Sequence, residues 1–158
     1  MKKRNVIVLL ASHGFVAAFG FAAGIYALPI LVAPAAPTMA EASAAAGSAT
    51  YTSEFRRDLK DSDALHWGEG PVYVGPTSIT HVGKLAPGPD YKLYLAREFV
   101  ETEEAFNRLK ATMTLVGDVK TFNNFSVPLP ADVNPSEYTT VIVWCEAFGE
   151  FITAARYK

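Results

Sequence analysis

Apolar residues form one long block near the N-terminus and a series of short blocks along the rest of the chain. The long block runs from Asn5 to Ala33 without a charged residue, more than the roughly 20 residues that a helix needs to cross a bilayer. The short blocks are rich in β-branched and aromatic residues, which is typical of β-strands. This pattern predicts an N-terminal transmembrane helix followed by a β-rich domain.

The most strand-like stretch is Thr139–Glu146, where β-branched residues lead to the chain's single cysteine, Cys145. Side chains alternate along a strand, so Val141 and Val143 should lie on the same face as Cys145. Trp144 should lie on the opposite face. Both faces are apolar, which is typical of a strand covered on both sides. We therefore predict a central strand with the cysteine near its end.

Turn residues separate further strand-like segments from about residue 68 onward. Strands are expected at residues 72–74, 78–82, 91–95, 115–119, 122–127 and 151–155. One helix is expected over Thr102–Lys110, because Thr102 can cap it and acidic residues follow in its first turn. The pattern predicts an all-β fold, an antiparallel β-sandwich or open barrel with one short helical insertion.

Four regions follow from this organisation. Residues 1–33 are expected to be a membrane anchor or signal segment. Residues 34–50 are rich in Ala, Pro and Ser and are expected to be a flexible linker. Residues 51–66 are polar and are expected to form a short helix or an irregular arm. Residues 67–158 are expected to form the β domain.

The charges before the apolar block predict the orientation of the helix. Lys2, Lys3 and Arg4 come first, and cations of this kind keep their end of a transmembrane helix in the cytoplasm. The β domain is then expected in the periplasm or outside the cell. The alternative is a cleaved signal peptide, because several alanines between Ala33 and Ala42 provide small-residue cleavage sites.

Composition limits the partners and the cross-links that the chain can have. The formal net charge is −2 at pH 7, and acidic residues outnumber basic ones from residue 51 onward. Nucleic acid is excluded as a partner, because binding its phosphates requires clustered Lys or Arg. A single cysteine cannot form an intramolecular disulfide, so the fold must be stable without one.

Four segments of the β domain occur in an order found in a known family: Gly83–Leu95, Val116–Lys120, Phe125–Pro128 and Tyr138–Cys145. Together they resemble the DM-thirteen domain, also called the electron-transfer DM domain. The resemblance covers about Trp67 to Lys158. It implies a compact all-β extracytoplasmic domain with a characteristic cysteine in the last long strand, here Cys145. A redox role has been proposed for this family because of that cysteine.

The chain departs from the family pattern in two respects. The helical stretch Thr102–Lys110 is expected to be an insertion between two of the strands. The chain also contains no second redox domain of the cytochrome type that accompanies some family members. We therefore expect the electron partner to be another molecule, an unidentified redox or envelope protein.

Cys145 is the candidate redox residue, and two interpretations of it stay open. A reactive thiol requires a nearby cation or helix N-terminus and access to solvent. The neighbouring valines favour a buried, inert thiol with a raised pKa. The position of Cys145 at the end of a strand, next to Glu146, leaves room for partial exposure.

His66 and His81 are candidate metal ligands that could join Cys145 in a copper or haem site. The ligand set is incomplete, because a tight zinc site has four ligands and a blue-copper site needs an axial ligand. There is also no Cys-x-x-Cys-His motif for covalent haem. The sequence therefore implies no particular cofactor. The alternative is that His66 lies on the surface and His81 within a strand pair.

The sequence favours a protein that is not a stand-alone enzyme, because it contains neither a nucleophile elbow nor a phosphate-binding glycine loop. Our first hypothesis is a membrane-tethered extracytoplasmic domain with a redox or electron-transfer role through Cys145. The second is a non-catalytic binding or envelope-structural domain that recognises a protein or a glycan.

Overall fold

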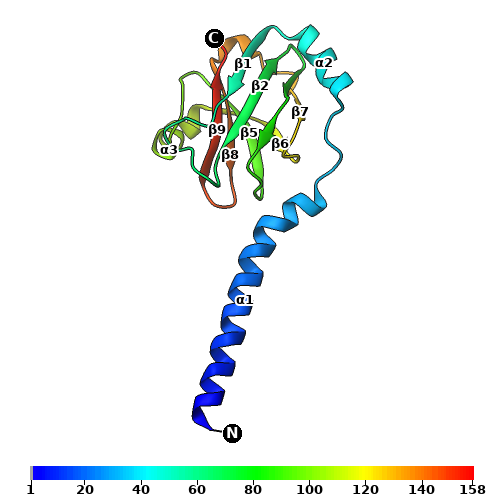
Figure 1. The fold of residues 1–158 in the computed structure, drawn as a ribbon. Coiled ribbons are helices and arrows are strands. Elements are labelled where there is room, and N and C mark those ends of the chain that lie inside the picture. Colours follow the sequence, from blue (N-terminus) through cyan, green and yellow to red (C-terminus); the bar gives the residue numbers. More distant parts are fainter. Residues whose placement is uncertain (1) are drawn as a thin grey trace.

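The structure, a computed structural model, describes residues 2–158 and places a long N-terminal helix at one end of a β-sandwich (Figure 1). Helix α1 (Lys3–Val32) has 30 residues, none of them buried. At 1.5 Å per residue it is about 45 Å long, enough to cross the roughly 30 Å hydrocarbon core of a bilayer. It is a candidate membrane span. Pro29 lies inside the helix, which bends near this end.

Within residues 2–158, nine strands form two antiparallel sheets, which confirms the predicted antiparallel β-sandwich. The first sheet has the order β1-β2-β3-β7, with β4 paired to β2. Its strands are β1 (Tyr51–Phe55), β2 (Gly68–Val74), β3 (Ser78–His81), β4 (Lys84–Leu85) and β7 (Phe125–Pro128). The second sheet has the order β6-β5-β8-β9. Its strands are β5 (Tyr91–Ala96), β6 (Thr114–Val119), β8 (Thr140–Cys145) and β9 (Glu150–Arg156).

Strand β8 lies in the interior of the second sheet, between β5 and β9, and all of its residues are buried. Val141, Val143 and Cys145 face the main core between the two sheets. Trp144 faces a second core on the outer side of the same sheet. The predicted central strand and its two apolar faces are therefore confirmed.

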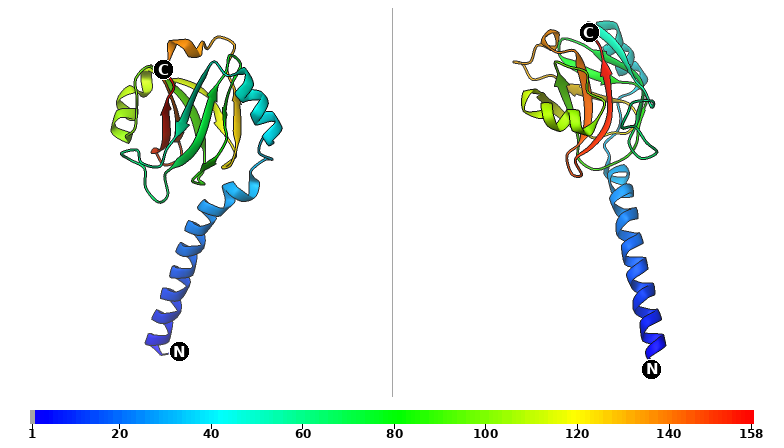
Figure 2. Two further views of the ribbon diagram at one scale, coloured as in Figure 1. Left: turned by 45° about the horizontal axis from the view of Figure 1, so that its top comes forward. Right: turned by 90° about the vertical axis from the view of Figure 1, so that its left-hand side faces the viewer.

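The second core is covered by helix α3 (Glu103–Leu109), at the edge of the sandwich in Figure 2, and the 3-10 turn η1 (Lys110–Thr112) follows this helix. The side chain of Thr102 caps α3 by accepting a hydrogen bond from the backbone N–H of Ala105 at 3.1 Å. The Phe106 ring stacks on Trp144 with 3.8 Å between centroids. The predicted helix is confirmed, and it supplies the apolar cover that the outer face of β8 requires. A second 3-10 turn, η2 (Pro135–Glu137), precedes β8.

The prediction of a helix or irregular arm for residues 51–66 is wrong at its start, where β1 pairs with β2 along its whole length. Phe55 is fully buried in the main core, whereas Thr52 and Glu54 are exposed. Only Tyr51 and Phe55 are large and apolar, so the alternation is too sparse to identify from sequence. The β-sandwich therefore begins at Tyr51.

The flexible linker expected at residues 34–50 contains a helix, α2 (Met39–Ser48), which lies beside the first sheet (Figure 1). Thr38 and Glu41 form a capping box: the Thr38 N–H donates to Glu41 Oε2 at 2.7 Å, and the Glu41 N–H donates to Thr38 Oγ1 at 3.3 Å. Ala42 is buried. Alanine has the highest helix propensity, so a capped alanine-rich segment against a sheet becomes helical.

Candidate redox site

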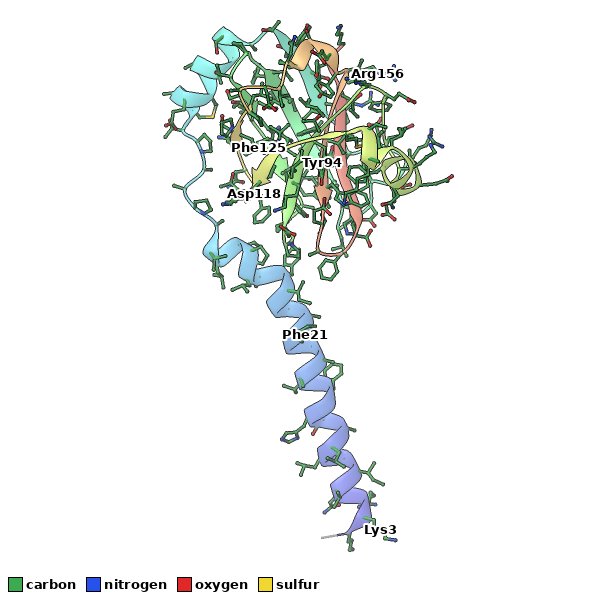
Figure 3. All side chains as sticks on the ribbon, turned by 180° about the vertical axis from the view of Figure 1, so that it is seen from behind. Lys3, Phe21, Tyr94, Asp118, Phe125 and Arg156 are labelled. Atoms are coloured by element: carbon green, nitrogen blue, oxygen red, sulfur yellow. The ribbon has the colours of Figure 1, made fainter. Side chains whose placement is uncertain are left out.

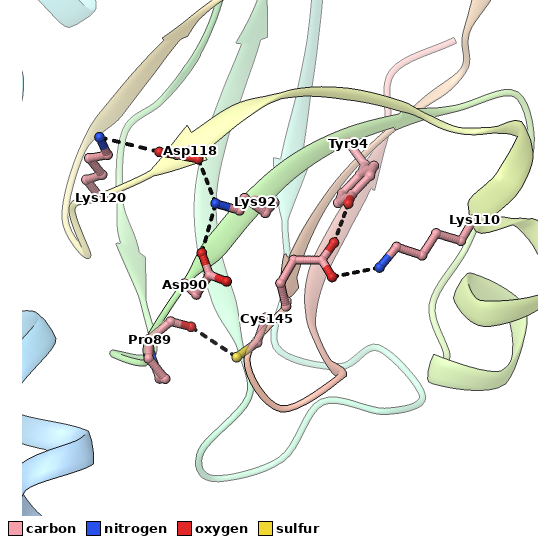
Figure 4. A network of polar contacts seen from close by, with 9 residues as sticks. Pro89, Asp90, Lys92, Tyr94, Lys110, Asp118, Lys120 and Cys145 are labelled. Carbon is pink, nitrogen blue, oxygen red and sulfur yellow. Dashed lines mark hydrogen bonds and ion pairs between the residues drawn. The ribbon is translucent and has the colours of Figure 1, made fainter.

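Cys145 is the last residue of β8, at the end of the β-sandwich nearest to α1. The residue is 2% exposed. The Sγ–H donates to the carbonyl oxygen of Pro89 at 3.1 Å, and Figure 4 shows the sulfur directed at this loop. The thiol is therefore buried, and its hydrogen takes part in a hydrogen bond.

The loop before β5 is fixed to the ends of both β5 and β8. Tyr91 Oη donates to the Ala86 carbonyl at 2.9 Å. A Cβ on Gly88 would lie 2.4 Å from Tyr91 Oη, so only glycine fits under this ring. Asp90 adopts a left-handed conformation (φ 54°), and its carbonyl accepts a hydrogen bond from the Glu146 N–H at 3.1 Å. The carbonyl that accepts the thiol hydrogen is thereby held in place.

The environment of Cys145 favours the protonated thiol. Burial raises the pKa of Cys145 above its ordinary value, and the negative charges of Asp90 and Glu150 raise this pKa further. The backbone N–H groups of Ala147 and Phe148 act in the opposite direction but do not outweigh burial. At neutral pH the resting state is therefore a thiol, which is a weaker nucleophile than a thiolate.

A cavity of about 140 Å³ adjoins Cys145. Its walls come from three parts of the chain: the C-terminal half of α1, the segment before β2, and the loops around Cys145. Its lining includes Ile25, Tyr26, Leu65, His66, Pro89 and Phe148. The wall is mostly apolar, and Cys145 and His66 share it with the carboxylate of Glu150. Sequence analysis missed Leu65, Pro89 and Phe148 because they come from loops far apart in the chain.

His66 lies on this cavity, and Asp63 positions it. The Nδ1 atom of His66 is 3.1 Å from Asp63 Oδ2. The other carboxylate oxygen, Oδ1, accepts the N–H groups of Leu65 at 2.7 Å and His66 at 2.8 Å. The hydrogen bond from the Leu65 N–H is the main cause of a pKa of Asp63 below its ordinary value, and the bonds from His66 act in the same direction. Burial acts to raise this pKa but is outweighed. The structure thus brings His66 and Cys145 to one cavity.

His81 lies elsewhere, inside the main core. Its ring is flanked by Phe55 and Phe125, with centroid distances of 5.0 and 5.2 Å, and Nδ1 is 3.1 Å from the Pro71 carbonyl oxygen. Burial lowers the pKa of His81 to about 4, although hydrogen bonding to backbone carbonyls acts to raise it. His81 does not line the cavity at Cys145. The two histidines and the cysteine therefore do not converge on one site.

Among residues 2–158, no three His, Cys, Asp or Glu side chains gather in a group that could hold a metal ion. The two-histidine, one-cysteine ligand set of a blue-copper centre is therefore not formed by this part of the chain. The thiol of Cys145, the imidazole of His66 and the carboxylate of Glu150 border the same cavity, but they do not gather closely enough to form such a group.

A hydrogen-bond network around the carboxylate of Glu146 lies next to Cys145 (Figure 4). Glu146, the next residue, accepts hydrogen bonds from Tyr94 Oη and, at 2.7 Å, from Lys110 Nζ. Burial acts to raise the pKa of Glu146, but these two hydrogen bonds outweigh it and lower that pKa. Burial, together with Glu146, raises the pKa of Tyr94. The network ties the end of β8 to β5 and to the turn after α3.

A second polar row lies on the other side of Cys145. Lys92 Nζ is 2.8 Å from both Asp90 Oδ1 and Asp118 Oδ1, and Lys120 Nζ is 3.4 Å from Asp118 Oδ2. The hydrogen bonds that Lys92 donates, first to Asp118 and then to Asp90, raise the pKa of Lys92. Lys92 in turn lowers the pKa of Asp118. A cavity of about 320 Å³ separates this row from the end of α1.

These features define a class of protein: an antiparallel β-sandwich with a single buried thiol at one end, preceded by a candidate membrane span. The model of the family described as Electron transfer DM13 matches residues 55–157, from the last residue of β1 almost to the C-terminus. The chain therefore belongs to the electron transfer DM13 family, as its sequence resemblance predicted. The comparisons found no matching curated protein and no matching solved structure.

Proposed function

We propose that this chain is a membrane-tethered redox domain whose reactive group is Cys145. The observation that carries the proposal is the position of Cys145, the chain's only thiol, on the wall of a cavity in a member of an electron-transfer family. The imidazole of His66 lies on the same wall.

The tether in this proposal is α1. Its length and composition suit a single membrane crossing, and the cations Lys2, Lys3 and Arg4 precede it. With that end in the cytoplasm, the β-sandwich lies in the periplasm or outside the cell. Disulfide chemistry is favoured in such compartments, which are more oxidising than the cytoplasm.

The redox step that suits one thiol is exchange with a disulfide of another protein. The sulfur of Cys145 attacks one sulfur of that disulfide, the partner's S–S bond breaks, and a mixed disulfide forms. The released partner sulfur takes up the proton that the Cys145 thiol loses. In this step Cys145 is oxidised to one half of the mixed disulfide, and the released partner sulfur is reduced to a thiol. A dithiol of another protein then attacks the Cys145 sulfur, which releases the second partner sulfur as a thiol, and the remaining thiol of that dithiol displaces Cys145 as its own disulfide closes. Two electrons thus pass from the dithiol to the partner disulfide, and Cys145 returns to the thiol.

The experiment uses the full chain in detergent micelles with dithiodipyridine, a small apolar disulfide that releases an absorbing product on exchange. We expect the folded thiol to exchange completely, and more slowly than the same chain unfolded in guanidinium, because burial raises the pKa of Cys145. Cys145→Ala is the blank. Exchange that occurs only as fast as global unfolding would contradict a redox role.

The burial of Cys145 specifically favours a second function, a non-catalytic domain that binds an envelope protein or a glycan. A cysteine that is 2% exposed, with a raised pKa, is also what a structural role requires. In that case Cys145→Ala would leave binding of the partner unchanged. A pull-down from solubilised envelopes with the full chain and with Cys145→Ala distinguishes the two functions.

A further inference from the structure

The connection between α1 and the β-sandwich is fixed rather than loose. Pro34 and Pro37 border a hollow whose other wall is formed by β6, β7 and the segment between them. The amide Nδ2 of Asn124 donates to the Pro37 carbonyl at 3.2 Å. The capped helix α2 follows directly. Residues 33–36 alone separate the end of α1 from Pro37, where the Asn124 hydrogen bond holds the chain to the sandwich. A connection this short keeps the same end of the domain facing the end of α1.

That end carries exposed apolar side chains. In the part of the chain that the structure describes after residue 33, four large hydrophobic residues are exposed: Met39, Leu65, Leu115 and Phe148. Leu65 is 60% exposed and Phe148 is 56% exposed. Both border the Cys145 cavity, opposite Ile25 and Tyr26 of α1. Two residues separated by more than half of the domain thus form one apolar surface beside the helix.

The length of α1 sets the level of this surface relative to a membrane. Counting about 20 residues from Asn5 places the outer limit of the hydrocarbon core near Gly24. Tyr26 then lies among the lipid head groups, where tyrosine is enriched in membrane proteins. Because Leu65 and Phe148 share a cavity with Ala22 and Tyr26, on either side of this limit, they lie close to the boundary between the hydrocarbon core and the head groups. Figure 3 shows the opposite end of the sandwich, at Arg156, pointing away from the helix.

The charges near this surface do not form a basic patch. Lys92 is shared by Asp90 and Asp118, and Lys120 is paired with Asp118. Asp63 and His66 are paired with each other. Contact with a membrane through this end therefore depends on apolar side chains, and it requires no anionic lipid.

We propose that the end of the β-sandwich that carries the Cys145 cavity rests on the outer leaflet of the membrane, with Leu65 and Phe148 inserted among the lipid head groups. The proposal rests on the membrane tether proposed above. It places the mouth of the cavity at the lipid surface. A disulfide partner then reaches Cys145 from the membrane side, so the partner is itself a protein of the membrane or its surface.

The test uses the full chain in vesicles of zwitterionic phosphatidylcholine with brominated acyl chains, which quench nearby indoles. Two matched variants, Phe148→Trp and Leu115→Trp, each add one indole to Trp67 and Trp144. Leu115, on β6, is 49% exposed and does not border the cavity. We expect the bromines to reduce the emission added by Phe148→Trp about twofold, and to leave that added by Leu115→Trp unchanged. High salt should not alter this difference.

Adding Leu65→Asp to Phe148→Trp should reduce the quenching, because a charge opposes insertion. An alkaline wash followed by flotation selects the chains that span the vesicle membrane. If the Phe148→Trp and Leu115→Trp indoles are quenched equally in those chains, the docking proposal is overturned and the tether is intact. Chains that the alkaline wash removes from the vesicles would overturn the tether, and the docking proposal with it.

Discussion

The Sγ–H of Cys145 donates to the carbonyl oxygen of Pro89 across 3.1 Å, so the chain's only thiol is bonded to the loop before β5. Nucleophilic attack by the sulfur requires loss of this hydrogen, and therefore of this bond. The same loop brings the carboxylate of Asp90 close enough to raise the pKa of the thiol. In the proposed redox role, burial and this one loop therefore limit the reaction of Cys145.

Alkylation of the folded thiol should have a pH midpoint above that of an exposed cysteine, because burial raises the pKa of Cys145. Asp90→Asn should lower this midpoint, since it removes a negative charge that raises the pKa, and asparagine tolerates the left-handed conformation of residue 90. Mass spectrometry of the full chain after timed iodoacetamide reaction across a pH series measures the midpoint. The exposed Asp132→Asn is the control, and an equal shift in both variants would contradict the assignment.

Lys110→Met should destabilise the β-sandwich by about 1 kcal/mol, because it leaves the partly buried carboxylate of Glu146 with Tyr94 as its remaining side-chain donor. The variant should also raise the pKa of Glu146, which Lys110 helps to lower. Denaturant unfolding at neutral pH measures the loss. Arg56→Met is the control, since its ion pair with Asp58 is exposed and should contribute little. Equal losses in the two variants would show that the Glu146 network is not stabilising.

The sequence was sufficient to predict β8 and α3, because each has a strong local signal. In β8 the consecutive apolar residues require cover on both faces, and the fold supplies it. In α3 the cap at Thr102 and the buried Phe106 specify the helix. Local signals failed for β1, whose pairing depends on β2, and for α2, whose alanine-rich composition is also that of a linker.

The candidate site could be predicted only in part, for a related reason. Cys145 was identifiable because it is the only thiol, and the strand pattern placed it near the end of β8. Its surroundings depend on which loops meet at that end of the sandwich. Pro89 and Phe148 reach Cys145 through the strand order of the second sheet. That order is a property of the tertiary fold, and no local pattern in the chain specifies it.

His81 should make the protein less stable in mild acid. Burial lowers its pKa to about 4, so between its ordinary value of 6.5 and this value the unfolded chain binds a proton that the folded chain does not. Stability therefore falls as pH falls through this range, by about 2 kcal/mol between about pH 7 and about pH 5. Denaturant unfolding at these two pH values measures the change. The carboxylates with lowered pKa contribute mainly at lower pH.

The acid sensitivity can be assigned with two variants. His81→Phe should remove most of the change between the two pH values, since the ring at this position would no longer titrate among Phe55 and Phe125. The control His66→Gln removes a histidine from the cavity wall and should still lose stability between the two pH values. If wild type and His81→Phe lose the same stability on acidification, the source is another group.

Helix α3 should be essential for the stability of the second sheet. The rings of Phe106 and Trp144 are both buried and stack with an interplanar angle of 9°. Phe106→Ala should therefore cost about 3 to 5 kcal/mol, the usual range for removing a buried phenylalanine, and should change the fluorescence of Trp144. Phe148→Ala removes the same group from an exposed position and should cost less than about 0.5 kcal/mol. Thermal and denaturant unfolding of the two variants measure both costs, and similar values would mean that α3 does not hold the outer face of β8.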